Sequence, residues 1–234
     1  MNAYIDGCPV TERSGYQVET NAFWYDMLCF AIEMESKYGR KTSGFGEKWS
    51  PVRGMVAENY QKMFWMPDKG YLADYVDNYG QNADVRPNQL FALAVHHQPV
   101  DDTVLGSIMN VVDRELVTSR GIRTLSPRDL KYKGVYEGTQ KERDMAYHQG
   151  CAWPALLLPY ARIKFRMDGA AFCKRAEWLM EGFYDDLNKH GVGMFSELYD
   201  GDPPHEPHGA ISSAMSTAAL LYVENLINKY KEER

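Results

Sequence analysis

The densest group of side chains that could do chemistry lies in residues 195–209, which read Phe-Ser-Glu-Leu-Tyr-Asp-Gly-Asp-Pro-Pro-His-Glu-Pro-His-Gly. This segment holds four carboxylates, two histidines and three prolines. Prolines restrict the backbone, so the acids are presented rigidly, as general acid–base catalysis requires. Glu197 has the apolar neighbours Phe195 and Leu198, and such surroundings can tune a carboxylate for proton transfer. We therefore predict a catalytic carboxylate at Glu197, although a solvated loop glutamate would fit the same local pattern.

Metal binding is the competing interpretation of this segment, because His205 and His208 stand among its acids. A calcium-binding loop would need ligands where Pro203 and Pro204 stand, and it would end in a bidentate glutamate. A zinc pair of histidines four residues apart on a helix is also absent. The sequence predicts neither a metal site nor a cofactor.

A second polar cluster covers residues 143–154, which read Arg-Asp-Met-Ala-Tyr-His-Gln-Gly-Cys-Ala-Trp-Pro. Tyr147, His148 and Gln149 offer hydrogen-bonding groups and Trp153 an aromatic platform, which together suit a hydroxyl-rich ligand. A structural histidine at a helix start is the alternative for His148. The Gly-x-Ser-x-Gly motif of serine hydrolases is absent. Residues at two other expected helix starts are further ligand-binding candidates: Asn21, Trp24, Tyr25, Arg86, Asn88 and Gln89. Each of these residues, taken singly, is more often a helix cap or a core residue.

Apolar residues at helical spacing indicate the elements that must position these clusters. They predict longer helices within 18–32, 52–63, 104–112, 172–187 and 211–222, and shorter ones at 87–96 and 154–167, each with proline in its first turn. Ser50 and Asp101 are the expected N-caps of two of them. No βαβ alternation is present, so the class is all-α, with about seven helices and long structured loops.

Three connections carry further information. Residues 70–77 and 194–200 are short and aromatic-rich, which predicts β-like segments or ordered loops. Residues 72–77 and 195–200 also align as apolar, small, acid, apolar, apolar, Asp, which favours a repeated helix–loop–helix unit and hence a helical array or toroid. In a toroid the candidates at helix starts would line one common end. Residues 121–150 lack helical periodicity but are rich in tyrosine, so we expect an ordered loop that covers a site.

The composition excludes several classes of function. A net charge of −6 without a basic run argues against nucleic-acid binding, and no apolar run reaches the ~20 residues that span a bilayer. The N-terminus lacks the pattern of a leader peptide, and four irregularly spaced cysteines predict reduced thiols, so we expect a cytoplasmic protein. Aromatic residues make up 13% of the chain, which suits the apolar faces of sugar rings but is equally typical of a core.

Taken in order along the chain, these motifs resemble the C-terminal catalytic domain of glycogen debranching enzymes, in particular the bacterial branch. The resembling segments are residues 9–11, 19–25, 86–93, 121–127, 132–134, 143–154 and 196–204. The resemblance implies an (α/α)₆ toroid that hydrolyses α-1,6-linked glucosyl branch stubs of glycogen-type α-glucans with inversion. It places the general base in the Ser-Glu-Leu-Tyr-Asp-Gly-Asp segment, at Glu197, and makes an α-glucan the expected partner.

The chain also departs from that family. The Gly-Arg-Asp-type motif expected to supply the general acid is absent. About seven helices are too few for the twelve of a complete (α/α)₆ toroid. Ser213 and Met215 replace the Gln and Trp that the family commonly has near the start of its last helix. We therefore expect residues 1–234 to form the C-terminal part of such a domain, an incomplete toroid that is inactive in isolation and that self-associates or pairs with the missing N-terminal part. A non-catalytic glycan-binding or scaffold protein is the alternative. Four acids are possible replacements for the general acid: Asp74, Asp77, Asp144 and Asp202.

Overall fold

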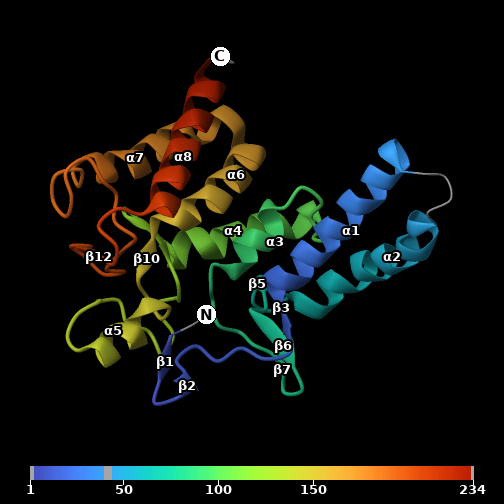
Figure 1. The fold of residues 1–234 in the computed structure, drawn as a ribbon, viewed down its shortest axis with the longest axis horizontal. Helices are drawn as coiled ribbons and strands as arrows, with labels where there is room; N and C mark the ends of the chain where they lie inside the picture. The colour runs from blue at the N-terminus through green and yellow to red at the C-terminus, as the bar shows by residue number, and fades with distance from the viewer. Residues whose placement is uncertain (1–2, 40–43, 233–234) are drawn as a thin grey trace. The chain divides into compact units, whose positions relative to one another are not determined.

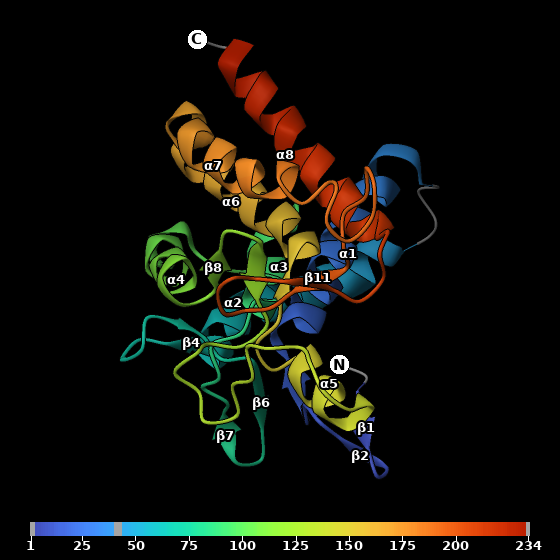
Figure 2. The same cartoon turned by 90° about the vertical axis from the view of Figure 1, so that its left-hand side faces the viewer.

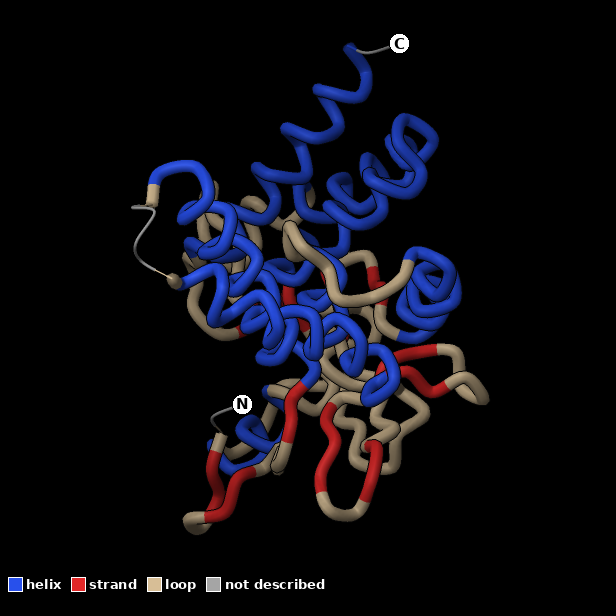
Figure 3. The backbone as a smooth tube through the Cα atoms, turned by 90° about the vertical axis from the view of Figure 1, so that its right-hand side faces the viewer, coloured by secondary structure: helices blue, strands red, loops and turns tan. Residues whose placement is uncertain are grey.

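A computed structural model describes residues 3–39 and 44–232. In this part of the chain, eight α-helices dominate and all strands are short, which confirms the all-α class (Figure 3). The α-helices are α1 (Val18–Tyr38), α2 (Phe45–Phe64), α3 (Asn88–Ala94), α4 (Asp102–Glu115), α5 (Gln140–Tyr147), α6 (Leu157–Asp168), α7 (Cys173–Tyr184) and α8 (Ala214–Glu232). Two 3₁₀ turns, η1 (Pro154–Leu156) and η2 (Gly169–Phe172), precede α6 and α7. No helix of the described residues is long and apolar enough to cross a bilayer.

The strands form small antiparallel pairings between the helices. One sheet has the order β12-β11-β10-β9-β8, a second has the order β3-β6-β7, and two further pairs are β1-β2 and β4-β5. Their bounds are β1 Tyr4–Ile5, β2 Cys8–Pro9, β3 Tyr16–Gln17, β4 Trp65–Met66, β5 Tyr71–Leu72, β6 Tyr75–Asp77, β7 Gly80–Gln81, β8 Val117–Thr118, β9 Gly121–Arg123, β10 Ala152–Trp153, β11 Leu198–Tyr199 and β12 Pro207–His208. The two segments predicted to be β-like, 70–77 and 194–200, thus contain β5, β6 and β11.

The chain divides into two compact units, and unit 1 comprises residues 1–12, 85–87 and 112–234. Its helices α6, α7 and α8 pack together (Figures 1 and 2). The residues of α7 that are buried recur three or four positions apart, as the periodicity predicted: Ala176, Leu179, Met180 and Phe183. The five-stranded sheet belongs wholly to this unit and carries both polar clusters.

Unit 2 comprises residues 13–84 and 88–111. In it α1 and α2 lie side by side as a hairpin, and α3 packs against α1 (Figure 1). The Tyr60 hydroxyl donates to the carbonyl of Val18 at 2.7 Å and ties the two long helices together. Asp101 acts at the start of α4 as predicted, because its carboxylate accepts from the backbone N–H of Thr103 at 2.9 Å.

Two local predictions were wrong. Ser50 is not an N-cap, because α2 begins at Phe45; the carboxylate of Glu35, on α1, accepts from the backbone N–H groups of Phe45 and Gly46 and extends the helix upstream. The connection 121–150 is not a loop throughout, since it contains β9 and α5. Helix α5 is only eight residues long, too short for an apolar stripe, and it starts with a capping box between Thr139 and Glu142.

An ion-pair triad in unit 2 leads to a prediction on pH. His97 Nδ1 lies 2.8 Å from Asp26 and its Nε2 lies 2.9 Å from Glu33, both on α1. Burial opposes protonation, but hydrogen bonds to Glu33 and Asp26 outweigh it, so the pKa of His97 is raised. The triad's contribution to stability is therefore complete below about pH 6.5, the ordinary pKa of histidine, and is lost as the pH rises through the raised value.

We expect the thermal midpoint to fall between about pH 6 and pH 9, and His97→Gln to remove that part of the fall. Thermal denaturation followed by circular dichroism measures this fall. His96→Gln is the control, because His96 contacts the ring of His97 at 4.6 Å between centroids but belongs to neither of the two ion pairs. An unchanged pH dependence in His97→Gln would show that the triad does not titrate as described.

Candidate active site

Strands β10, β11 and β12 bring the two polar clusters of the sequence together in unit 1. Ala152 pairs with Tyr199, and Leu198 pairs with His208. The segment 143–154 therefore lies beside the segment 195–209, although 50 positions separate Tyr147 from Glu197 in the chain. A small buried core of Ala146, Cys151 and Leu198 lies beneath this junction.

Both carboxylate oxygens of Glu197 are held. The Tyr147 hydroxyl donates to Oε1 at 2.6 Å, and the backbone N–H of Ala210 donates to Oε2 at 2.9 Å. The backbone of Glu197 is fixed as well, because its N–H donates to the carbonyl of Ala210 at 3.0 Å. The side chain is half-buried, and each carboxylate oxygen retains a lone pair for a further donor such as water. This is an oriented carboxylate that can accept a proton.

Aromatic rings surround this carboxylate. Tyr147 meets Trp153 edge-on at 4.9 Å between ring centroids, and the ring of His148 stacks on Trp153 at 5.6 Å with an interplanar angle of 18°. Trp153 Nε1 donates to the carbonyl of Tyr147 at 3.2 Å, which fixes the indole. Tyr136, which we did not predict, meets Tyr147 at 6.0 Å. Half-buried rings in fixed orientations can accept the apolar face of a ligand.

Burial sets the protonation states of two of these side chains. It lowers the pKa of His148 to about 4, so the imidazole is neutral near pH 7. Burial and then the bond to Glu197 raise the pKa of Tyr147 above its usual range, so the phenol stays protonated and remains a donor to the carboxylate. Near pH 7, therefore, neither His148 nor Tyr147 carries a charge.

Two of the predicted ligand-binding residues, Arg86 and Gln149, lie behind this cluster. Both side chains are buried. Arg86 Nη2 donates to Gln149 Oε1 at 2.6 Å and Arg86 Nη1 to the carbonyl of His148 at 2.8 Å, while Gln149 Nε2 donates to the carbonyl of Val10 at 3.2 Å. In this structure they position the segment that carries Tyr147 and His148.

The acids and histidines after Glu197 hold the loop that follows. Buried Asp200 accepts from the backbone N–H of Tyr136 at 2.7 Å, and its carboxylate lies 3.0 Å from His208 Nε2 without hydrogen-bond alignment. His205 Nδ1 lies 2.8 Å from the carbonyl of Asp200, and Asp202 accepts from the Tyr132 hydroxyl at 2.8 Å. Across the described ranges, no three His, Cys, Asp or Glu side chains are grouped to hold a metal ion.

The other predicted residues belong to unit 2. Asn21 donates to the carbonyl of Gln17 at 2.8 Å, at the first turn of α1. Trp24 meets Trp49 edge-on at 5.9 Å, and Tyr25 lines a separate cleft. Asn88 and Gln89 are buried at the start of α3 and bind the segment 72–74: Asn88 Nδ2 donates to the carboxylate of Asp74 at 2.7 Å, and Gln89 Oε1 accepts from the N–H of Leu72 at 3.3 Å.

The segments 72–77 and 195–200 have the same local structure, as their sequence similarity predicted. Asp74 precedes the hairpin β6-β7 and Glu197 precedes β11-β12; the N–H of Asp74 donates to the carbonyl of Asn82 much as that of Glu197 donates to Ala210. Their carboxylates differ. Asp74 is buried and bound by Arg13 and Asn88, whereas Glu197 is half-buried and meets only a hydroxyl and an amide. Of the two acids, only Glu197 is placed to meet a ligand.

Comparison with solved structures defines the class of protein. The fold matches neutral trehalase from Saccharomyces cerevisiae with a TM-score of 0.69 and 11% identity, over 93% of this chain and 39% of that one. It matches glucoamylase from Saccharomycopsis fibuligera with a TM-score of 0.62 and 17% identity, over 94% and 57%. A mannosylglycerate hydrolase from Thermus thermophilus matches with a TM-score of 0.59 and 15% identity, over 88% and 45%. Nearly the whole chain therefore corresponds to part of the six-hairpin glycosidase fold, as predicted.

The sequence narrows this class to one family. The profile of the amylo-alpha-1,6-glucosidase family matches residues 1–222, and the chain belongs to that family. The glycogen debranching enzyme of Saccharomyces cerevisiae is 26% identical over 238 aligned residues, which cover 83% of this chain and 15% of the yeast enzyme. The chain thus spans a small part of the length of this relative and about two fifths to three fifths of the length of the solved structures.

Proposed function

We propose that this chain carries the general-base half of an amylo-α-1,6-glucosidase site and acts on α-1,6-linked glucosyl stubs of glycogen-type α-glucans with inversion. The observation that carries the proposal is the geometry of Glu197. Its carboxylate is oriented by the Tyr147 hydroxyl and the Ala210 amide, and it lies among aromatic rings. Membership of the family supports the substrate class.

In the proposed reaction Glu197 accepts a proton from water as that water attacks the anomeric carbon. Inversion needs a second carboxyl group, about 6.5–9.5 Å away, to protonate the leaving oxygen. The neutral imidazole of His148 and the indole of Trp153 would line the sugar site. Tyr147 keeps the carboxylate oriented, and the buried pair Arg86 and Gln149 supports the segment beneath it.

We propose that the general acid comes from a segment that longer relatives have and that these 234 residues do not contain. The acids considered as substitutes are engaged elsewhere. Asp74 is buried against Arg13, Asp77 accepts from Ser14 and from the N–H of Tyr79, Asp144 accepts from Gln140, and Asp202 accepts from Tyr132.

The predicted pairing with such a segment, or self-association, is supported by an exposed apolar face on α1: Phe23, Met27 and Phe30. Buried thiols at Cys29, Cys151 and Cys173 support the predicted cytoplasmic location.

The test is glucose release from a glucosyl-branched maltooligosaccharide by three proteins: this chain, a version extended upstream, and that version with Glu197→Gln. We expect activity in the extended protein alone. An inactive extended protein would favour the alternative, a non-catalytic glycan-binding or scaffold protein. Activity in the unextended chain would contradict the proposal that its site lacks the acid.

A glycine beside Glu197 provides a second prediction. Gly209 has φ +73°, and a Cβ there would lie 2.6 Å from Glu197 Oε2. Gly209→Ala should displace the carboxylate and lower the rate of the extended enzyme by roughly 10²-fold, as misplacement by about 1 Å does. Gly193→Ala is the matched control, because Gly193 has φ +69° with nothing within 4 Å of its Cβ. Equal rate losses in the two variants would mean that backbone strain, and not contact with Glu197, is responsible.

A further inference from the structure

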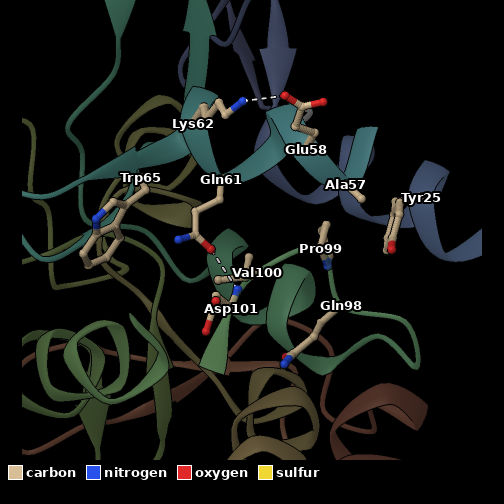
Figure 4. A pocket seen from close by; sticks show the side chains of 10 residues that line it. All are labelled: Tyr25, Ala57, Glu58, Gln61, Lys62, Trp65, Gln98, Pro99, Val100 and Asp101. Carbon is tan, nitrogen blue, oxygen red and sulfur yellow. Dashed lines mark hydrogen bonds and ion pairs between the residues drawn. The ribbon is translucent and has the colours of Figure 1, made fainter. Parts of the chain in front are cut away.

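A cleft in unit 2 lies outside the set of residues that surround Glu197. Its volume is about 570 Å³, within the range of about 300–1,000 Å³ typical of small-molecule sites. It is lined by residues of α1, α2 and β4 and by the segment 98–101 that precedes α4. Trp65 and Tyr25 lie at its two ends, with Gln61 between them (Figure 4). The reaction proposed above uses none of these groups.

The backbone of Trp65 is fixed on several sides. Its N–H donates to the carbonyl of Gln61 at the end of α2, and the residue pairs with Leu72 across β4 and β5. Its carbonyl accepts from Gln81 Nε2 at 3.3 Å. The backbone that carries the half-buried indole is therefore set in place before any ligand arrives, which limits the ordering cost of binding.

Amides and acids provide the polar groups of the cleft. Gln61 Oε1 accepts from the backbone N–H of Asp101 at 2.8 Å, which orients its NH₂ group; among the described residues that group has no hydrogen-bond acceptor. Gln98 Nε2 donates to Asp102 Oδ1 at 2.7 Å. Oriented amides beside an aromatic ring match a ligand with hydroxyl groups at its edge and apolar C–H groups on its face.

The charges of the cleft exclude anionic ligands. Its single cation, Lys62, is paired with Glu58 at 2.9 Å on the exposed rim, and Asp101 adds a second acid. A phosphate or carboxylate ligand would need several positively charged side chains that point toward it. The one cation in the lining of this cleft is already paired with an acid. A neutral ligand is the one that the cleft suits.

We propose that this cleft is a second α-glucan-binding site, in which a glucosyl ring lies against Trp65 and its hydroxyls meet the amide of Gln61. The choice of an α-glucan as the ligand rests on the proposed function, whereas the choice of a neutral sugar rests on the cleft itself. Such a site would hold a polysaccharide chain without cleaving it.

The test follows the five tryptophan indole N–H signals of the chain by ¹H–¹⁵N NMR during titration with maltoheptaose. The signal of Trp65 should shift saturably, while that of Trp178, which lies on α7 and does not line the cleft, should not. Retardation of the chain by glycogen in native gels gives a second readout. Trp65→Ala should weaken it roughly tenfold, the loss of about 1.4 kcal/mol. Trp178→Ala should leave the retardation unchanged.

The possible outcomes separate the two proposals. An unmoved Trp65 signal overturns the inference, even if Trp65→Ala proves too unstable to study. A shift of Trp153 alone overturns it while leaving the Glu197 site in place. A shift of Trp65 without glucose release by the extended enzyme supports the cleft and contradicts the proposed function. Equal shifts with the β-linked cellohexaose would overturn the assignment of an α-glucan.

Discussion

Replacing Glu197 by Gln should slow the hydrolysis of α-D-glucosyl fluoride by this chain by about 10²–10⁴-fold, the usual contribution of a general base. Fluoride leaves without needing a proton from a carboxylic acid, so this substrate requires only the half of the mechanism that we assign to these residues. The glutamine amide retains the shape of the carboxylate and can still accept from Ala210, but it cannot take a proton from water.

Two further measurements test whether Glu197 acts as the base: the anomer of glucose that is released first, and the rate of a matched variant. An inverting site must release β-glucose first, which ¹H NMR distinguishes from α-glucose before mutarotation. Tyr147→Phe keeps the carboxylate and removes only the 2.6 Å hydrogen bond to it, so we expect a smaller loss than in Glu197→Gln. Full activity in Glu197→Gln, or α-glucose as the first product, would remove Glu197 from the role of base.

Replacing Arg13 by Met should lower the free energy of unfolding by about 3–5 kcal/mol, the range observed when one partner of a buried ion pair is removed. Arg13 Nε lies 2.7 Å from Asp74, and the side chains of Arg13 and Asp74 are only 10% and 1% exposed. Arg13 also binds Glu19. Without the guanidinium, the buried carboxylate of Asp74 loses the charge and the 2.7 Å hydrogen bond that Arg13 provides.

Urea denaturation of a double-mutant cycle measures this coupling. Asp74→Asn removes the buried charge, so adding it to Arg13→Met should restore part of the lost stability. The control is Lys62→Ala, which breaks an exposed pair with Glu58 and should cost under about 1 kcal/mol. If Arg13→Met costs no more than Lys62→Ala, the ion pair does not stabilise unit 2 as described.

The helical spacing of apolar residues predicted a helix correctly wherever that helix buries one side against its neighbours. The stripe on α7 was recognised because Leu179, Met180 and Phe183 repeat at helical spacing and are all buried. It failed where a distant residue, or a cap in a stretch without apolar periodicity, sets the start of a helix. The start of α2 depends on Glu35, ten positions upstream of Phe45, and α5 depends on a capping box in a stretch with no apolar stripe.

The same contrast holds for the candidate site. Residue types and their order were sufficient to predict Glu197, Tyr147, His148 and Trp153 as candidates, because carboxylates and aromatic rings in rigid loops are rare enough to notice. Tyr136 was not singled out as a site residue, although it lies in the segment 121–150 that was expected to cover a site. Its contacts with Tyr147 and His208 bring it to the cluster, and both partners are distant in the chain.

By itself the sequence determined the all-α class, most helices and the family, and it predicted Glu197 as the candidate catalytic acid, because these depend on residue types at short spacing. Only the tertiary structure decided which polar groups remain available. Asp74 and Glu197 occupy the same place in two similar hairpins, yet Arg13 neutralises one and Tyr147 orients the other. Arg86 and Gln149 proved to be buried supports of the site. These distinctions arise from partners tens of residues away, which short-range patterns in a chain do not encode.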